Sequence, residues 1–386
     1  MEKESCIVRP RKVSLNLFRC IGRRTKSQAI RNKNVPSVTV ETGKEDSGEA
    51  QTTNIAADLE NASATPETKP ALPSKCKLRL EEVYIHSDML LQRPFSQWTL
   101  LMLNTASVTI TKLSLKLTMN AKSTWKLFSA TLSLPLLRTF SFTNDFFMSS
   151  DVALFTDIED FLLNHPGIKR LSLYGVGLPP SSAVPRPMFQ DLISIDAHPF
   201  YIIWFMNSLS LNPNPLPSLQ RVTISSDNYA RSIAYGKGPD FDDSLFDSAL
   251  EAISSFPRNI ALTLTFNSKS HIEDWIDFHV RAGVERSVIS RLVHITRVSI
   301  NNNIWHKFTD ATLANIPDWL ALFPALEYFN FEWEVAINEK RLTEPQYLAM
   351  ISVSCPKLEM IEVNWRMFNL WLIQKNLGAC DDECTK

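Results

Sequence analysis

Glycine is scarce in this sequence, at ten of 386 residues. Nucleotide-binding loops depend on closely spaced glycines, because only a residue without a side chain lets the backbone approach a phosphate closely. No G-x-G-x-x-G is present, and the nearest glycine pair, in YGKGPD at 235–240, follows no strand-like run. The sequence therefore argues against a doubly wound nucleotide-binding sheet, and we interpret residues 235–240 as an exposed loop.

The short motifs of several enzyme and metal-site classes are also missing. There is no G-x-S-x-G nucleophile elbow, and HIEDWIDFH at 271–279 lacks the H-E-x-x-H spacing of a zinc site, so we expect a solvated, charged helix face there. The acidic segment at 240–247 has no glycine where a calcium loop must turn. We predict a protein that is not an enzyme and has no cofactor, metal or catalytic residues. A repeat-containing hydrolase or transferase remains an alternative, because catalytic residues far apart in sequence leave no motif.

Disulfide spacing, charge imbalance and long apolar runs are absent as well. The six cysteines are spread along the chain without C-x-x-C pairs, which favours a reducing compartment, the cytoplasm or the nucleus. The net charge of −1 provides no general attraction to nucleic acid. The densest apolar run, 200–206, is too short to cross a bilayer. We therefore expect neither a membrane nor a nucleic-acid partner.

Residues 1–75 differ in composition from the rest of the chain. Ten Lys and Arg residues lie within 1–33, whereas seven acidic residues lie within 41–69, and large apolar residues are few after Phe18. Such a segment buries too little surface to offset its ordering entropy, so we predict a disordered arm, basic and then acidic. Its basic start fits a nuclear or nucleic-acid patch, a mitochondrial presequence or, the interpretation we favour, a solvated tail; Glu2 and Glu4 argue against the presequence.

A spaced pattern fills the remainder, residues 76–386. In FPALEYFNFEW at 323–333 and CPKLEMIEVNW at 355–365, apolar residues stand two, five and seven positions after a proline, and tryptophan stands nine after it. Strict and looser copies of this pattern start at residues 78, 108, 135, 166, 217, 257, 293, 324 and 356. The apolar residues five and seven positions after the start are separated by one residue, and this alternation predicts a strand in each copy. The long interval between 166 and 217 holds proline-rich segments at 178–187 and 212–217, which we interpret as surface loops.

Helical patterns lie between the copies. Leu154, Ile158, Phe161 and Leu162 form one apolar stripe. Ser270 and Glu273 have the spacing of a capping box, and Thr343 precedes Pro345 as a helix cap would. Further helices are expected at 242–256, 311–323 and, after the last strand, 368–377. Because proline cannot continue a helix, we expect each proline to end one element and start the next.

Ten positions after the start of each copy, five of nine residues are Asn or Asp. The resulting pattern, clearest in ITRVSINNN at 295–303 and LQRVTISSD at 219–227, resembles the strand half of a leucine-rich repeat. The resemblance implies an α/β leucine-rich-repeat solenoid of about nine irregular repeats, a horseshoe with parallel strands on the concave face and helices on the convex face. One repeat cannot bury its own apolar side, so neighbours bury it jointly.

The irregular spacing also resembles the repeat region of fungal F-box proteins. That resemblance implies a non-enzymatic protein–protein recognition module, the substrate-selecting part of a ubiquitin-ligase receptor with ligase core subunits among its partners. In that family an N-terminal F-box docks on the ligase, and residues 1–75 contain no such segment. A free-standing scaffold or regulator without a ligase link is therefore the alternative.

Alternate strand positions should face the open side of the sheet. Six consecutive copies carry Ser or Thr six positions after their start, beside a column of basic residues. We predict that this face binds an extended partner, acidic where it meets the basic residues, through Lys112, Arg170, Tyr174, Arg221, Arg297, Tyr328 and Glu332. The simpler alternative is a polar sheet face that is only solvated. Trp333 and Trp365 share the parity of core positions, which favours core or turn packing over a role as aromatic anchors.

Overall fold

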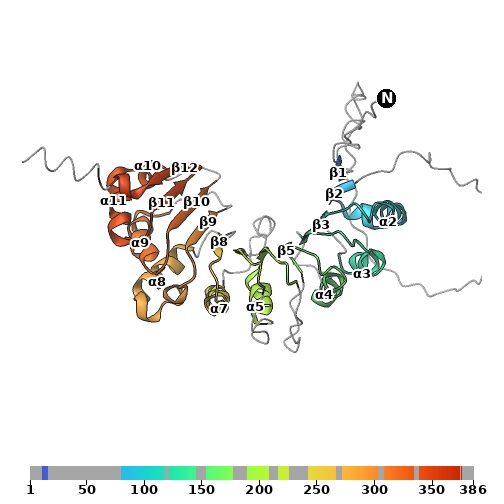
Figure 1. Cartoon of the computed structure of the whole chain (residues 1–386), viewed down its shortest axis with the longest axis horizontal. Helices are drawn as coiled ribbons and strands as arrows, with labels where there is room; N and C mark the ends of the chain where they lie inside the picture. Colours follow the sequence, from blue (N-terminus) through green and yellow to red (C-terminus); the bar gives the residue numbers. More distant parts are fainter. Residues whose placement is uncertain are drawn as a thin grey trace, which may run out of the picture. The chain divides into compact units, whose positions relative to one another are not determined.

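The computed structural model describes residues 11–15, 80–117, 121–144, 154–176, 189–207, 216–225, 242–266, 272–302, 308–333, 339–373 and 375. The described elements belong to one compact unit, built on a twelve-stranded sheet whose strands are adjacent in sequence order (Figure 1). The strands are β1 (Arg11–Leu15), β2 (Leu80–Ile85), β3 (Lys112–Leu117), β4 (Thr139–Asn144), β5 (Arg170–Tyr174), β6 (Ser194–Ala197), β7 (Arg221–Ser225), β8 (Ala261–Phe266), β9 (Arg297–Asn302), β10 (Tyr328–Trp333), β11 (Met360–Val363) and β12 (Arg366–Asn369).

Helices connect the strands and cover one face of the sheet (Figure 1). The α-helices are α2 (Phe95–Thr105), α3 (Ala121–Thr131), α4 (Phe155–Leu163), α5 (Pro199–Asn207), α7 (Asp243–Ser254), α8 (Ile272–Arg286), α9 (Asp310–Ala321), α10 (Glu339–Leu342) and α11 (Pro345–Ser354), and the 3-10 turns are η1 (Asp88–Leu91) and η3 (Val288–Arg291). None of these helices combines the length and apolarity that a membrane crossing requires.

The order of the strands identifies the architecture. From β1 to β11 each strand pairs in parallel with the next, and β12 pairs antiparallel with β11. A doubly wound sheet reverses its strand order at a switch point, and no reversal occurs among the described strands. The chain is therefore an α/β protein in a solenoid-like arrangement, with a sheet that does not close on itself.

All nine predicted strands are confirmed, with the predicted parity. From β3 onward each predicted strand starts four residues after its copy of the pattern, and the fifth and seventh positions are buried. In β4, for example, Phe140 and Phe142 are fully buried and contact Trp125 of α3 at ring-centroid distances of 6.0 and 5.1 Å. Phe161 of α4 contacts the same indole at 5.2 Å. Here α3 and α4 thus pack on the buried side of the sheet and on each other.

A turn at the start of several copies explains the recurring proline. The N–H two positions after the proline site donates to the carbonyl one position before it, as in Leu137 to Leu134, Ile168 to His165, and Leu358 to Cys355. The proline is then the second residue of a β-turn, where its fixed φ is favoured. Most residues are also tolerated there, and Val293 takes the same place in the turn from Leu292 to Ile295.

Neighbouring repeats are joined by a second regular contact. At seven junctions between neighbouring repeats, the carbonyl three positions after the start of a copy accepts the N–H of the equivalent residue of the next repeat, over 2.7 to 2.9 Å; between β7 and β8, the carbonyl of Gln220 accepts the N–H of Ala261 at 2.8 Å. The pairs are Thr111 to Glu81, Arg138 to Thr111, Lys169 to Arg138, Ile193 to Lys169, Gln220 to Ile193, Glu327 to Thr296, and Glu359 to Glu327. This contact sets the register in which the open-face residues line up.

A tenth repeat was missed in the interval between 166 and 217. It starts at Gln190, with Leu192, Ile195 and Ala197 at the apolar positions, and it forms β6 between β5 and β7. Its turn joins Phe189 and Leu192 as in the other copies. The interval therefore holds a whole repeat that the sequence pattern did not predict. The strand was missed because it lacks proline and ends in alanine. The predicted loops at 178–187 and 235–240, and most of 212–217, lie outside the described residues.

The two ends of the sheet also differ from expectation. Arg11–Leu15 form β1, paired with β2, where no strand was expected; the rest of residues 1–75 lies outside the described part, so the disordered arm stays a prediction. After β11 the chain turns at Asn364 and Trp365, both with positive φ, and returns as β12. The turn breaks the parity of the strand, so Trp365 is 79% exposed and not in the core. The helix expected from residue 368 starts two residues later.

Several local expectations are corrected by the positions of the helices. Leu154 precedes α4 and is exposed, and Phe155 takes its place in the buried stripe. Glu344, not Thr343, precedes α11, with Pro345 at its first turn as predicted. Ser270 lies outside the described residues. Glu273 caps the next helix instead, because its carboxylate accepts the N–H of Thr309 at 3.1 Å at the start of α9.

We expect Gly175→Ala to lower the free energy of unfolding more than Gly283→Ala. Both glycines have φ near +65°, a conformation that costs other residues about 1–3 kcal/mol. A Cβ at Gly175 would lie 2.1 Å from the backbone oxygen of Asn144 in the neighbouring strand, whereas a Cβ at Gly283 would meet open space. The clash should add roughly 1–3 kcal/mol.

Urea denaturation of the two variants and the wild type measures this difference. Equal destabilisation would contradict the close approach of β4 to the end of β5.

Candidate functional site: the polar open face of the sheet

The strand register aligns the side chains of the open face in rows. One row contains Arg170, Ser194, Arg221, Ala261, Arg297 and Tyr328 on successive strands from β5 to β10. The next row contains Ser172, Asp196, Thr223, Thr263, Ser299 and Asn330. Buried residues alternate with these positions, so both rows point away from the helices.

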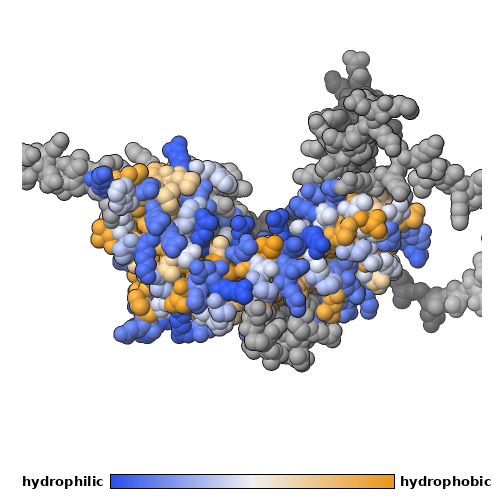
Figure 2. Space-filling view, viewed as in Figure 1, coloured by the Kyte–Doolittle hydropathy of each residue, from blue (hydrophilic) through white to orange (hydrophobic). Residues whose placement is uncertain are grey.

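Two hollows are open to this face. The larger, of about 540 Å³, is lined by Tyr174, Asp196, Arg221, Thr223, Ser225, Ala261, Thr263, Thr265, Arg297, Ser299, Asn301, Tyr328 and Asn330. The smaller, of about 360 Å³, lies beside it and shares Arg221, Ala261 and Arg297 with it, and Arg170 lines its wall. Nearly all of the lining side chains are polar. Hydrophobic residues on the molecule's visible face are scattered among hydrophilic ones (Figure 2).

The predicted partner-binding residues divide between these hollows and their surroundings. Four of them, Tyr174, Arg221, Arg297 and Tyr328, line the larger hollow, and Arg170 lines the smaller. Lys112 lies outside both, on β3, where its Nζ is 5.0 Å from the centre of the Tyr84 ring. The backbone of Glu332 pairs with Asn301, and the position of its side chain is outside what the structure describes. Their role in binding stays a prediction.

A hydrogen-bonded cluster forms one end of the larger hollow. The hydroxyls of Tyr174 and Ser225 both donate to Oδ1 of Asp196, the latter at 3.3 Å. Burial raises the pKa of the Asp196 carboxyl above its ordinary 3.8, and these two hydrogen bonds oppose that shift. Asp196 was not predicted as a site residue, because the sequence pattern did not reveal β6. The spacing of Leu192, Ile195 and Ala197 was the signal that could have revealed it.

Contacts of Tyr328 fix the side chains at the opposite end of the larger hollow. Its hydroxyl donates to the Glu362 carboxylate, and the guanidinium of Arg297 lies 4.7 Å from the centre of its ring. Such a cation–π contact limits the directions in which an exposed arginine can point. Asn330 lies next to this pair in the adjacent row, and it is buried with no hydrogen-bond partner for its Oδ1.

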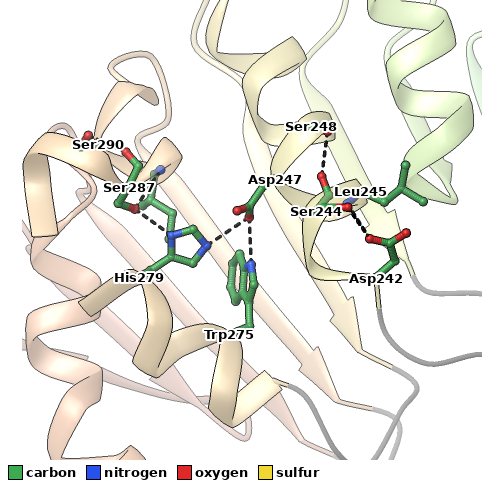
Figure 3. A network of polar contacts seen from close by, with 10 residues as sticks. Asp242, Ser244, Leu245, Asp247, Ser248, Trp275, His279, Ser287 and Ser290 are labelled. Atoms are coloured by element: carbon green, nitrogen blue, oxygen red, sulfur yellow. Dashed lines mark hydrogen bonds and ion pairs between the residues drawn. The ribbon is translucent and has the colours of Figure 1, made fainter. Parts of the chain in front are cut away.

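Figure 3 shows a second polar cluster, on the helical side of the sheet. Asp247 Oδ1 accepts Trp275 Nε1–H at 3.0 Å and lies 3.1 Å from Nε2 of His279, while Nδ1 of His279 lies 2.9 Å from Ser287 Oγ. The neutral tautomer with a proton on Nε2 satisfies every contact, since it donates to Asp247 and accepts from Ser287. The expectation that 271–279 is a solvated face is therefore wrong for His279, which is 1% exposed and contacts Asp247 of α7 and Ser287.

This Ser–His–Asp sequence of contacts differs from a catalytic triad in its burial. Ser287 and His279 are each 1% exposed, and Ser287 Oγ also accepts the N–H of Ile289 at 3.2 Å. A nucleophilic serine must face a space that admits a substrate carbonyl. The cluster instead links α7, α8 and η3 through hydrogen bonds.

The thiol of Cys355 is a further reactive group, and it is buried. Burial, with a smaller effect of Asp318, raises the pKa of the Cys355 thiol to about 12, so this thiol is protonated and a poor nucleophile at neutral pH. No three His, Cys, Asp or Glu residues within the described ranges are grouped as metal ligands would be.

We expect Asp247→Ala to lower the free energy of unfolding by about 1–3 kcal/mol, because Trp275 Nε1 and His279 Nε2 lose their acceptor. Glu285→Ala, at an exposed position of α8, is the control, with an expected change within about 0.5 kcal/mol. Thermal and urea unfolding measure both. If the two variants were equally stable, the cluster would not have the structural role assigned to it.

We expect Asp196→Asn to change how stability depends on pH. The folded protein holds the Asp196 proton to higher pH than the unfolded chain, so this group lowers the free energy of unfolding as pH rises from about 3.8 to the raised native pKa. Asparagine keeps an acceptor for both hydroxyls and has no such titration.

Urea unfolding at a series of pH values gives the stability of the variant relative to wild type. That difference should rise through this pH window and then become constant. A variant that loses stability relative to wild type over the window would contradict the burial of a charged carboxylate here.

Comparison with known proteins adds no further assignment. No protein-family model matches the sequence, and no curated protein matches it significantly.

Proposed function

We propose that the chain is a leucine-rich-repeat solenoid, and that the open face of its sheet recognises a protein partner. The partner is an extended segment, acidic where it meets Arg170, Arg221 and Arg297. One observation carries this proposal: the three guanidinium groups are exposed in one register row, and within the described residues none of them forms a hydrogen bond or an ion pair. Unpaired arginines of this kind are suited to bidentate recognition of anionic groups.

The dimensions of the face favour an extended segment over a small molecule. Arg170 on β5 and Arg297 on β9 are four strand spacings apart, or about 19 Å. An extended peptide of about six residues spans that length. Small-molecule sites are usually enclosed and mostly apolar, whereas these hollows are open and polar.

The strand order and the repeated turn support the leucine-rich-repeat assignment. A solenoid uses an exposed strand face of this kind as its extended binding surface. The position-ten residues that first suggested the resemblance lie mostly outside the described residues, so the support comes from the strand half of the repeat.

Within this function, we favour a substrate-selecting receptor of the F-box type, on the likeness of the irregular repeats to that family. The alternative is a free-standing scaffold or regulator. Affinity capture from native cells, followed by mass spectrometry, separates them. Recovery of ubiquitin-ligase core subunits supports the receptor. Recovery of other partners without these subunits supports the scaffold.

We expect Arg170→Glu, Arg221→Glu and Arg297→Glu together to reduce partner capture at least about tenfold, because like charges then face the acidic segment. The matched control changes three exposed cations on the helices, Lys126→Glu, Arg281→Glu and Arg286→Glu, and so alters the net charge equally. The control should capture the partner as wild type does.

Circular dichroism and thermal unfolding verify that both triple variants are folded. Unchanged capture by the open-face variant would contradict the proposed surface.

A further inference from the structure

We propose that the open face holds a phosphate monoester of its partner, a phosphorylated serine or threonine, between Arg221 and Arg297 and above Ala261. This inference rests on the proposed recognition of a protein segment and adds the chemistry of one subsite.

The order of side chains in the row that contains the arginines creates the subsite. Ala261 on β8 stands between Arg221 on β7 and Arg297 on β9, and all three line both hollows. Each arginine is one strand spacing, about 4.8 Å, from the alanine. The short alanine leaves space above the sheet, and two long guanidinium groups border that space. Tyr328 stacks under the guanidinium of Arg297 and thereby restricts its direction.

Hydroxyl groups form the adjoining part of this space. Thr223, Thr263 and Ser299 occupy the next row on the same three strands, and all three line the larger hollow. Each hydroxyl can donate one hydrogen bond to an anionic oxygen. The nearest carboxyl in that row, Asp196, lies two strands from β8 and already accepts the hydroxyls of Tyr174 and Ser225.

A phosphate fits this donor set better than a carboxylate. A carboxylate has two oxygens and one charge, which one bidentate arginine satisfies. A phosphate monoester has three acceptor oxygens and nearly two charges, so it can engage two guanidinium groups and a hydroxyl at once. The two arginines are within reach of one such group, and no acid among the described residues forms an ion pair with either of them.

A peptide explains the remaining polar group better than a nucleic acid does. Asn330 lines the larger hollow at 7% exposure, and its Oδ1 has no donor. The backbone N–H of a bound peptide is such a donor. A nucleic acid would place one phosphate at every nucleotide, and the carboxylates of Asp196 and Glu362 at the two ends of this row would repel them.

Degenerate peptide libraries test the inference with the full-length chain. Three libraries differ only at a fixed central residue, which is phosphoserine, serine or glutamate. We expect the wild type to retain the phosphoserine library at least about tenfold better than the other two. Arg221→Gln with Arg297→Gln should abolish that preference, and Ala261→Leu should do so by filling the space.

Matched controls keep the interpretation specific. Arg281→Gln with Arg286→Gln makes the same change in net charge on α8 and should retain the preference. Ala261 lies on the open face and not in the core, so its replacement leaves the packing of the sheet intact, which thermal unfolding verifies.

Each other outcome has a defined meaning. Equal retention of the glutamate and phosphoserine libraries overturns the phosphate subsite and keeps the acidic-partner proposal. If no library is retained, but the open-face charge reversals still reduce partner capture, the phosphate subsite is overturned and the acidic-partner proposal stands. Retention of no library, with capture insensitive to those reversals, overturns both. Binding of a homopolymeric RNA or of phosphoinositide vesicles through the same arginines, without phosphopeptide binding, assigns the site to another class and overturns the inference.

Discussion

A backbone hydrogen bond that recurs between neighbouring repeats, together with the pairing of the strands, determines where the residues of the open face lie. At seven junctions the carbonyl at the third position of one repeat accepts an N–H from the same position of the next, as Arg138 does from Lys169 at 2.7 Å. A slip of one residue would exchange the buried and exposed sides of a strand, and would place arginines in the core. The apolar residues of each repeat and this contact enforce the same register, and the pairing of β7 with β8 and of β8 with β9 places Arg221, Ala261 and Arg297 in one row.

Because the register is fixed locally, the connections between strands can vary without disturbing the face. The connections from β5 to β6 and from β7 to β8 differ greatly in length, yet Arg170, Ser194, Arg221 and Ala261 remain in one row. Variation in the loops costs only loop entropy, which grows slowly with length. Single residues then determine the chemistry of the face. The short side chain of Ala261 leaves a space, and Arg221 and Arg297 lie on either side of it. At the two ends, Tyr174 and Tyr328 donate hydrogen bonds to the carboxylates of Asp196 and Glu362.

Periodicity predicted nine strands and the parity of their side chains, because burial on one side of a strand imposes period two. It did not reveal β6, since Ala197 gives a weak apolar signal and no proline begins that repeat. Asp196 was consequently unseen. Burial of His279 was also missed, since the sequence of α8 does not say which neighbours pack on it. Trp365 was assigned to core or turn packing because strand parity was continued through Asn364, whose positive φ the sequence does not indicate. The position of Arg170, Arg221 and Arg297 on one face could be predicted, whereas their lack of ion pairs among the described residues required the structure.

Amide hydrogen exchange of residues 192–197 tests the account most directly, because β6 connects the two halves of the sheet and positions the arginine row. If β6 is a strand of the stack, its amides should exchange as slowly as those of 170–174 and 221–225, since all three segments unfold together. Exchange as fast as that of an unstructured peptide would show that the sheet is interrupted there. The continuous face would then be lost.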